Sequence, residues 1–208
     1  YVEPAGGASL TAALAAGAPV TLPTLDSFVD GAAVARIGVR PFDILRQVPP
    51  QHVLRIPENR LCITIQEILN TEGIVLEPAG ALSIDALRDL GPEIEGRRIV
   101  CVATGGNFDF ERLPDVKERA MRFAGLKKYY VLRMPQRPGA LRDFLDILGP
   151  YDDIARFEYL KKSARNFGSV LIGIESREPQ AFAQLETRMA ELGMAARDLT
   201  DDPLLGEL

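Results

Sequence analysis

The sequence is poor in the residues on which many enzymes depend. Its 208 residues include no tryptophan, two cysteines and a single histidine, His52. A single histidine excludes any mechanism that needs two histidines in this chain. Cys62 and Cys101 lie among apolar residues, with no second Cys or His at ligand spacing. This pattern favours small buried side chains in a reducing compartment over a disulfide or a metal site.

Long apolar runs and a secretory leader are also missing. No run approaches the length of a membrane span, and we find no signal-peptide pattern. The net charge is −5, and the Lys and Arg residues are spread along the chain, which argues against nucleic acid as a partner. We therefore expect a cytoplasmic protein with neither a membrane nor a nucleic-acid partner.

The composition is that of a globular protein, with 47% hydrophobic and 25% charged residues. The length allows one large domain or two small ones. The chain begins Tyr1-Val2-Glu3-Pro4, without an initiator methionine and inside a predicted strand. We interpret it as the C-terminal part of something longer, in which an N-terminal part of the first domain is missing.

A change of pattern near residues 124–127 divides the chain. The following elements are predicted after it: a strand at 127–135, a helix at 137–149, strands at 153–163 and 169–176, a helix at 178–193 and a strand at 194–200. Apolar residues at helical spacing mark the helices, namely Leu141, Phe144, Leu145 and Leu148 in the first and Phe182, Leu185, Met189 and Leu192 in the second. The order βαββαβ predicts a ferredoxin-like fold.

The first part has a less regular α/β pattern. We expect helices at 9–17, 40–48 and 60–73, a strand end that runs into a helix across 75–91, and a buried strand at 97–103. VEPAGGASL at 2–10 is echoed by LEPAGALSI at 76–84. Glu3, Glu77 and Thr104 each fall at a predicted strand end, where α/β sheets bind ligands. They are therefore predicted to share one crevice.

Two interpretations of these residues stay open. In Thr104-Gly105-Gly106-Asn107, the glycines can simply let a strand reverse, or Thr104 can offer its hydroxyl to a neutral ring nitrogen while bare backbone approaches closely. Glu77 and Glu3 can be acids at helix N-termini or carboxylates that face the crevice.

Two further segments are equally open. The small-residue stretch at 26–38 is either an active-site loop or a packing segment. The RPGAL sequence at 137–141 is either a plain helix start or a place where Gly139 and free N–H groups receive a carboxylate.

The chain resembles biosynthetic threonine dehydratase (threonine ammonia-lyase). The resemblance rests on PVTLPTLDSFVDGAAVARIG, GIVLEPAGALSI and VCVATGGNFDFERL, followed by MPQRPGALRDFLDIL, in that order. It implies that residues 1–124 are the C-terminal part of a fold-type II pyridoxal-phosphate catalytic domain, and that residues 125–208 are an ACT-like regulatory domain. The family converts L-threonine to 2-oxobutanoate and ammonia for isoleucine biosynthesis, with inhibition by isoleucine, frequent opposition by valine, and a homotetrameric assembly.

The resemblance also implies site residues. Thr104, where the family commonly has Ser, would meet the pyridine nitrogen, with Gly105, Gly106, Asn107 and Glu77 on the same wall. The Schiff-base lysine and the phosphate loop are expected upstream, so no catalytic residue is expected here, and the chain alone should be inactive. A metal site is not expected, because Gly7 and Ser9 replace the usual ligands of related racemases.

The expected effector contacts lie on the first regulatory helix and the next strand. They are Gly139, Leu141, Phe144, Phe157 and Tyr159. Two alternatives remain at this point, namely an amino-acid-binding regulatory fragment without catalysis and a related serine/threonine dehydratase.

Overall fold

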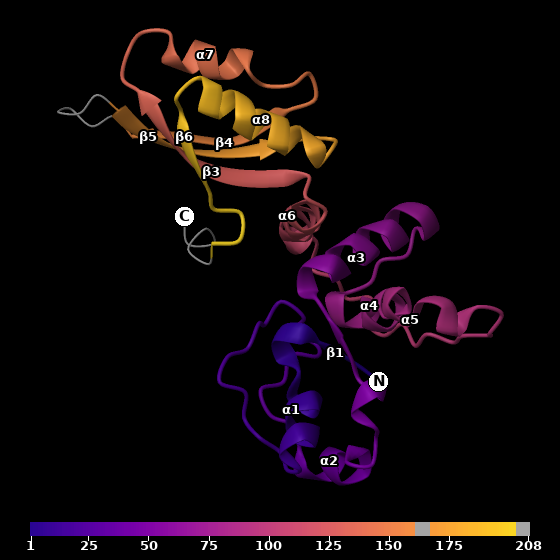
Figure 1. Ribbon diagram of the computed structural model, residues 1–208. Coiled ribbons are helices and arrows are strands. Elements are labelled where there is room, and N and C mark those ends of the chain that lie inside the picture. The colour runs from indigo at the N-terminus through magenta and orange to yellow at the C-terminus, as the bar shows by residue number, and fades with distance from the viewer. Residues whose placement is uncertain (161–166, 203–208) are drawn as a thin grey trace. The chain divides into compact units, whose positions relative to one another are not determined.

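The computed structural model describes residues 1–160 and 167–202, and the chain divides into two compact units, Tyr1–Ala120 and Met121–Leu208 (Figure 1). The first contains strands β1 (Val2–Pro4) and β2 (Leu54–Ile56), helices α1 (Ser9–Ala16), α2 (Val39–Leu45), α3 (Glu58–Glu72), α4 (Pro78–Asp85) and α5 (Leu87–Leu90), and 3₁₀ turns η1 (Ala5–Gly7), η2 (Pro50–His52), η3 (Gly91–Ile94) and η4 (Phe110–Arg112). Helix α6 (Leu113–Phe123) begins in the first unit and ends in the second. The second contains β3 (Lys127–Pro135), α7 (Ala140–Asp146), β4 (Asp153–Leu160), β5 (Phe167–Glu175), α8 (Gln180–Glu191) and β6 (Ala195–Asp198).

The core of the first unit is built mainly by helices. Strand β1 pairs in parallel with β2, with Val2 opposite Leu54 and Pro4 opposite Ile56. Helix α3 buries one face against α4, and it ends at Gly73, whose φ of 67° lies in the left-handed region that glycine adopts freely. The predicted helices are present, whereas β2 was not predicted, because three residues are too few to show a strand period.

The predicted buried strand at 97–103 is wrong. The segment has no regular secondary structure, and Val100 and Val102 are 89% and 69% exposed. One side chain of α4 bonds this segment: the Ser83 hydroxyl donates to the carbonyl of Val102 at 2.8 Å. The strand predicted just before Glu77 is also absent. A strand must satisfy its backbone N–H and C=O groups through neighbouring strands, and an apolar sequence cannot supply those neighbours.

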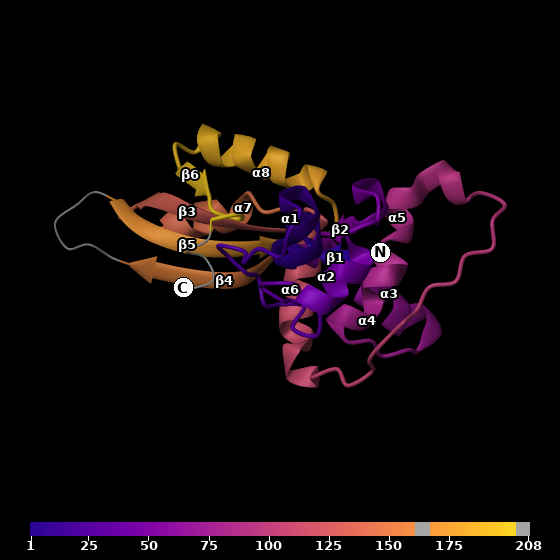
Figure 2. The same ribbon diagram turned by 90° about the horizontal axis from the view of Figure 1, so that it is seen from below.

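The second unit has the predicted βαββαβ order and a four-stranded antiparallel sheet in the order β4-β5-β3-β6. Helices α7 and α8 lie on the same face of this sheet (Figures 1 and 2). The ferredoxin-like prediction is therefore confirmed. The end of the strand predicted at 153–163 and the turn after it include residues 161–166, which lie outside the described residues.

The residues under the two helices form the second core. Tyr130, Leu132 and Met134 alternate on β3, and Val170, Ile172 and Ile174 alternate on β5, so both strands turn the same face to the helices. The predicted stripe of α7 divides into two faces: Phe144 is fully buried, whereas Leu141 and Leu145 are 43% and 45% exposed. Leu192, predicted on the α8 stripe, is likewise 40% exposed.

Candidate cofactor and effector sites

The Thr104 turn and the start of α4 interlock through two glycines. The amide of Glu77, the residue before α4, donates to the carbonyl of Gly105 at 3.2 Å. A Cβ atom on Gly80 would lie 1.8 Å from the carbonyl oxygen of Thr104. A Cβ atom on Gly105, whose φ is 75°, would lie 1.9 Å from Oε1 of Glu77. Only glycine at these two positions allows the backbones and the carboxylate to approach so closely.

This arrangement brings Glu77 and the turn together, as predicted, although neither follows a strand. Thr104, Gly106 and Asn107 are exposed, and Glu77 is half-buried. Among the described residues, the hydroxyl of Thr104 has no hydrogen-bond partner. The turn therefore presents a neutral hydroxyl that can donate or accept, beside backbone without side chains.

Glu3 does not share this arrangement with Glu77 and Thr104. Its carboxylate is buried and accepts hydrogen bonds from the amides of Leu10 and Thr11, each at 2.9 Å, and from the hydroxyl of Thr11. These donors belong to the first turn of α1, so the acid satisfies amides that the helix itself leaves unpaired. The predicted common crevice is corrected accordingly, because Glu3 acts as a helix cap.

The small-residue segment at 26–38 belongs to the core in its first part. Phe28 and Val29 are 4% and 0% exposed. The guanidinium groups of Arg112 and Arg119 lie 4.9 and 4.2 Å from the centre of the Phe28 ring, and Arg112 also donates to the carbonyl of Phe28 at 2.6 Å. Packing is therefore the better interpretation here, since cation–π contacts and burial fix the segment.

Acidic and sulfur ligands do not gather into a metal centre in the part of the chain that the structure describes. Cys62 is buried, and burial raises the pKa of its thiol to about 12, so it remains protonated at neutral pH.

A cavity of about 430 Å³ lies within the second unit, between the start of α7 and the edge strand β4. It is lined by Met134, Pro135, Arg137, Gly139, Ala140, Leu141, Arg142, Leu145, Phe157 and Tyr159. Four of the five predicted effector residues are in this set. The fifth, Phe144, is fully buried in the core because it lies on the sheet-facing side of α7, so its prediction as a contact is corrected.

The wall of this cavity combines half-exposed apolar groups with two cationic groups. Leu141, Leu145, Phe157 and Tyr159 are 38–45% exposed and together present apolar surface to the cavity. Gly139 precedes α7 at a φ of 86° and leaves one side of the cavity without a side chain. Sequence reasoning missed Leu145 as a lining residue, although its position one turn after Leu141 was a usable signal.

Comparisons with known proteins agree with this two-part organisation. The family model "Pyridoxal-phosphate dependent enzyme" matches residues 1–105, and "C-terminal regulatory domain of Threonine dehydratase" matches residues 118–208. A curated L-threonine dehydratase (biosynthetic, IlvA) of Staphylococcus saprophyticus is 43% identical over 100% of the chain and 49% of its own length. A second curated protein with the same name, from Halalkalibacterium halodurans, is 42% identical. That match covers 99% of this chain and 50% of the relative's own length.

Among solved structures, the processed form of threonine deaminase isoform 2 from Solanum lycopersicum has a TM-score of 0.52 and 32% identity, covering 57% of this chain and 35% of that one. The chain thus spans about half the length of the curated relatives it matches. No helix within residues 1–160 and 167–202 is both long and apolar enough to cross a membrane.

Proposed function

Because the chain belongs to the family of pyridoxal-phosphate dependent enzymes, we propose that the complete protein is a threonine dehydratase that converts L-threonine to 2-oxobutanoate and ammonia. The observation that carries the proposal is the match of residues 118–208 to the regulatory domain of threonine dehydratase, in the same chain as the catalytic family match. We further propose that it serves isoleucine biosynthesis in the cytoplasm as a homotetramer, with a domain boundary near residues 124–125.

The Thr104 turn fits one edge of the proposed cofactor. When bound, pyridoxal phosphate supplies an electron-accepting aromatic ring. The exposed hydroxyl of Thr104 can hydrogen-bond a ring nitrogen without adding charge, and the bare backbone of Gly105 and Gly106 leaves space beside it. Glu77 would hold the turn in place, and Asn107 would add a polar contact. The catalytic lysine and the phosphate-binding groups are proposed to belong to the rest of the complete protein.

The proposal is tested by substituting Thr104 in the complete protein. Valine has nearly the same shape but no hydroxyl, so Thr104→Val should weaken cofactor binding about 10-fold or more. Thr104→Ser keeps the hydroxyl and should stay within about threefold of the wild type. Cofactor affinity is measured from visible absorbance, and 2-oxobutanoate release gives the activity. A complete, folded protein that takes up no cofactor, or releases no 2-oxobutanoate from threonine, would refute the proposed function.

We propose that the 430 Å³ cavity receives isoleucine as an inhibitor, with valine as its competitor. The apolar groups of Leu141, Leu145 and Phe157 suit a branched aliphatic side chain, and Arg137 and Arg142 suit a carboxylate. Because the cavity lies wholly within the second unit, it also supports the second candidate function, an amino-acid-binding regulatory module. That alternative is favoured if the complete protein binds isoleucine but never takes up cofactor.

The effector proposal predicts a loss of inhibition in Phe157→Ala. Removing a ring that lines the cavity should raise the isoleucine concentration for half-inhibition about 10-fold or more, with little change in uninhibited activity. The matched control is Phe167→Ala on β5, because Phe157 and Phe167 are 38% and 39% exposed and Phe167 does not line the cavity. Equal inhibition of the two variants would remove this cavity from the proposal.

A further inference from the structure

The first unit carries a groove of about 650 Å³ between the second half of α3 and the start of α6. We call it the α6 groove, and its lining residues are Gln66, Leu69, Asn70, Phe110, Leu113, Pro114 and Lys117. None of them belongs to the Thr104 turn or to the effector cavity. Four of the seven side chains are apolar, so the groove is a largely apolar surface outside both sites described above.

The apolar wall of the groove follows from the spacing of residues along one helical segment. The 3₁₀ turn η4 continues directly into α6. The inner face of α6 buries Val116 and Ala120 in the core of the first unit. Phe110, Pro114 and Lys117 follow one another at intervals of four and three residues, which places them together on another face, the one that lines the groove.

Phe110 is the most exposed apolar side chain of this wall. It is 63% exposed, and its ring meets the ring of Phe108 edge to face, with the ring centres 5.7 Å apart. Phe108 belongs to the core and is 9% exposed. Contact with a core residue orients the exposed ring, so little ordering cost accompanies its burial by a partner. An oriented aromatic ring beside an apolar groove is typical of a protein interface.

Opposite charges flank Pro114 at equal spacing. Glu111 lies three residues before Pro114, and Lys117 lies three residues after it. Both charged side chains are exposed. In the part of the chain that the structure describes, neither the carboxylate of Glu111 nor the ammonium of Lys117 has a hydrogen bond or an ion pair. Both charges are therefore available to a partner.

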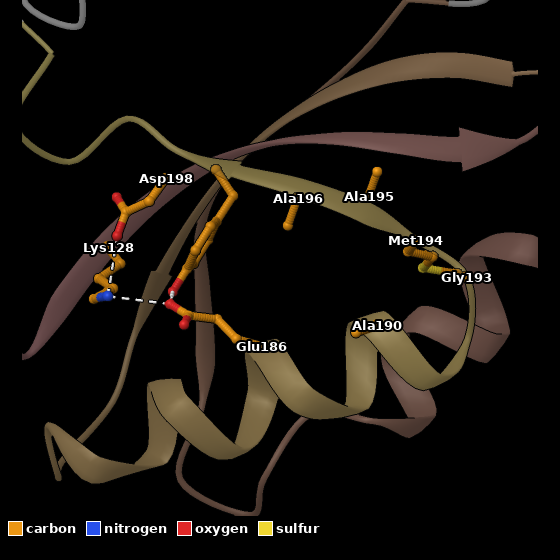
Figure 3. Close-up of a pocket in the computed structure, with 9 residues that line it drawn as sticks. Lys128, Glu186, Ala190, Gly193, Met194, Ala195, Ala196 and Asp198 are labelled. Carbon is orange, nitrogen blue, oxygen red and sulfur yellow. Dashed lines mark hydrogen bonds and ion pairs between the residues drawn. The ribbon is translucent and has the colours of Figure 1, made fainter.

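A cavity of the second unit shows the contrasting case. This cavity, of about 570 Å³, lies between α8 and β6, and the ammonium of Lys128 in it donates to Glu186 at 3.1 Å and to Asp198 at 3.0 Å (Figure 3). These charges satisfy one another within the fold. Those of Glu111 and Lys117 do not, and an apolar groove lies beside them, so the α6 groove is the surface that suits a protein partner of complementary charge.

We propose that two copies of this chain associate through the α6 groove, with their helical segments antiparallel about a two-fold axis at Pro114. A two-fold interface is self-complementary, because each contact occurs twice. Antiparallel pairing places Glu111 of one copy opposite Lys117 of the other, on both sides of the axis. Each Phe110 ring covers part of the other copy's groove, so apolar contact and two ion pairs act together.

This inference deepens the proposed homotetramer by naming one of its surfaces, and it rests on that part of the proposed function. It depends neither on the cofactor nor on the turnover of threonine. A tetramer with two-fold symmetry contains more than one kind of interface. Loss of the α6 groove contact should therefore leave a smaller assembly of folded chains.

Sedimentation velocity of the complete protein over a concentration series tests the apolar part of the interface. Phe110→Ala should raise the concentration for half-association about 10-fold or more, because a buried aromatic side chain carries much of the binding energy of an interface. The matched control is Phe123→Ala, since Phe123 lies on the same helix, is 48% exposed and does not line the groove. The control should associate like the wild type. Circular dichroism confirms that both variants are folded.

A charge exchange tests the two-fold pairing. Glu111→Lys or Lys117→Glu alone brings like charges together twice, so each should weaken association about 10-fold or more, with a larger effect at low salt. The double variant Glu111→Lys/Lys117→Glu restores both ion pairs in the reverse order. It should associate within about threefold of the wild type.

Three results would overturn the proposal. They are a wild-type protein that stays monomeric, a Phe110→Ala variant that associates like Phe123→Ala, and a double variant that associates no better than the single variants. Coverage of the groove by another part of the complete protein would give the second result. A protein that associates as expected but releases no 2-oxobutanoate from threonine would refute the proposed reaction alone, so the two proposals fail separately.

Discussion

Gly80→Ala should weaken cofactor retention by the complete protein about 100-fold and lower the free energy of unfolding of the first unit by about 3 kcal/mol. The new Cβ would lie 1.8 Å from the carbonyl oxygen of Thr104 and 2.8 Å from that of Gly105. Backbone cannot yield as the end of a flexible side chain can, so the turn must leave α4. The hydrogen bond from the amide of Glu77 to Gly105 would be lost in the same movement.

Gly106→Ala is the matched control for this substitution. It adds the same methyl group to the same turn, but the nearest atom, the carbonyl oxygen of Val75, would lie 3.5 Å away, an ordinary contact. Its urea midpoint should stay close to that of the wild type. A Gly80→Ala protein with the same urea midpoint as Gly106→Ala would show that α4 and the Thr104 turn do not interlock.

Asp85→Ala should destabilise the first unit by about 3–5 kcal/mol, because it removes one partner of a buried ion pair. The side chain of Asp85 is completely buried; it accepts from Arg60 at 2.8 Å and from the hydroxyl of Thr64 at 2.7 Å. Removing it leaves the hydroxyl of Thr64, which is 3% exposed, without its acceptor, and leaves Arg60 short of a counter-charge.

The control for Asp85 is Asp89→Ala, which removes the other acid bound to Arg60. Asp89 receives two hydrogen bonds from this guanidinium, but its side chain is 30% exposed, so water can replace it. We expect a loss of about 1 kcal/mol or less. Urea unfolding of the 208-residue chain measures both values, and equal losses would contradict the assignment of Asp85 as the buried anchor of α3 and α4.

The second unit could be predicted almost completely from local patterns. Its strands alternate with period 2 and its helices with period 3.6, so the βαββαβ order followed directly. The pattern failed on α7, where it assigned all apolar residues to one buried face. Phe144 and Leu145 are neighbours in sequence, but Phe144 is buried and Leu145 is 45% exposed. One faces the sheet and the other the cavity, and only the packing of the helix distinguishes them.

The first unit shows the opposite case. The segment that contains Val100 and Val102 is apolar enough for a buried strand, yet both side chains are exposed. The glycines of the turn were predicted, but the partners of their bare backbone were not, because Gly80 and Glu77 lie far from Gly105 in sequence. The register in which β6 pairs with β3, which leaves space between β6 and α8, could not be predicted from the sequence either.

The sequence by itself determined the order of elements in the regulatory unit, the positions of most helices, and the motifs by which the family was recognised. These features depend on residues that are close together in the chain, because the spacing of apolar residues favours a helix or a strand locally. The tertiary structure alone decided that Glu3 caps a helix, that Glu77 closes the Thr104 turn, and which side chains line each cavity. Those outcomes depend on contacts between distant segments, which no local pattern encodes.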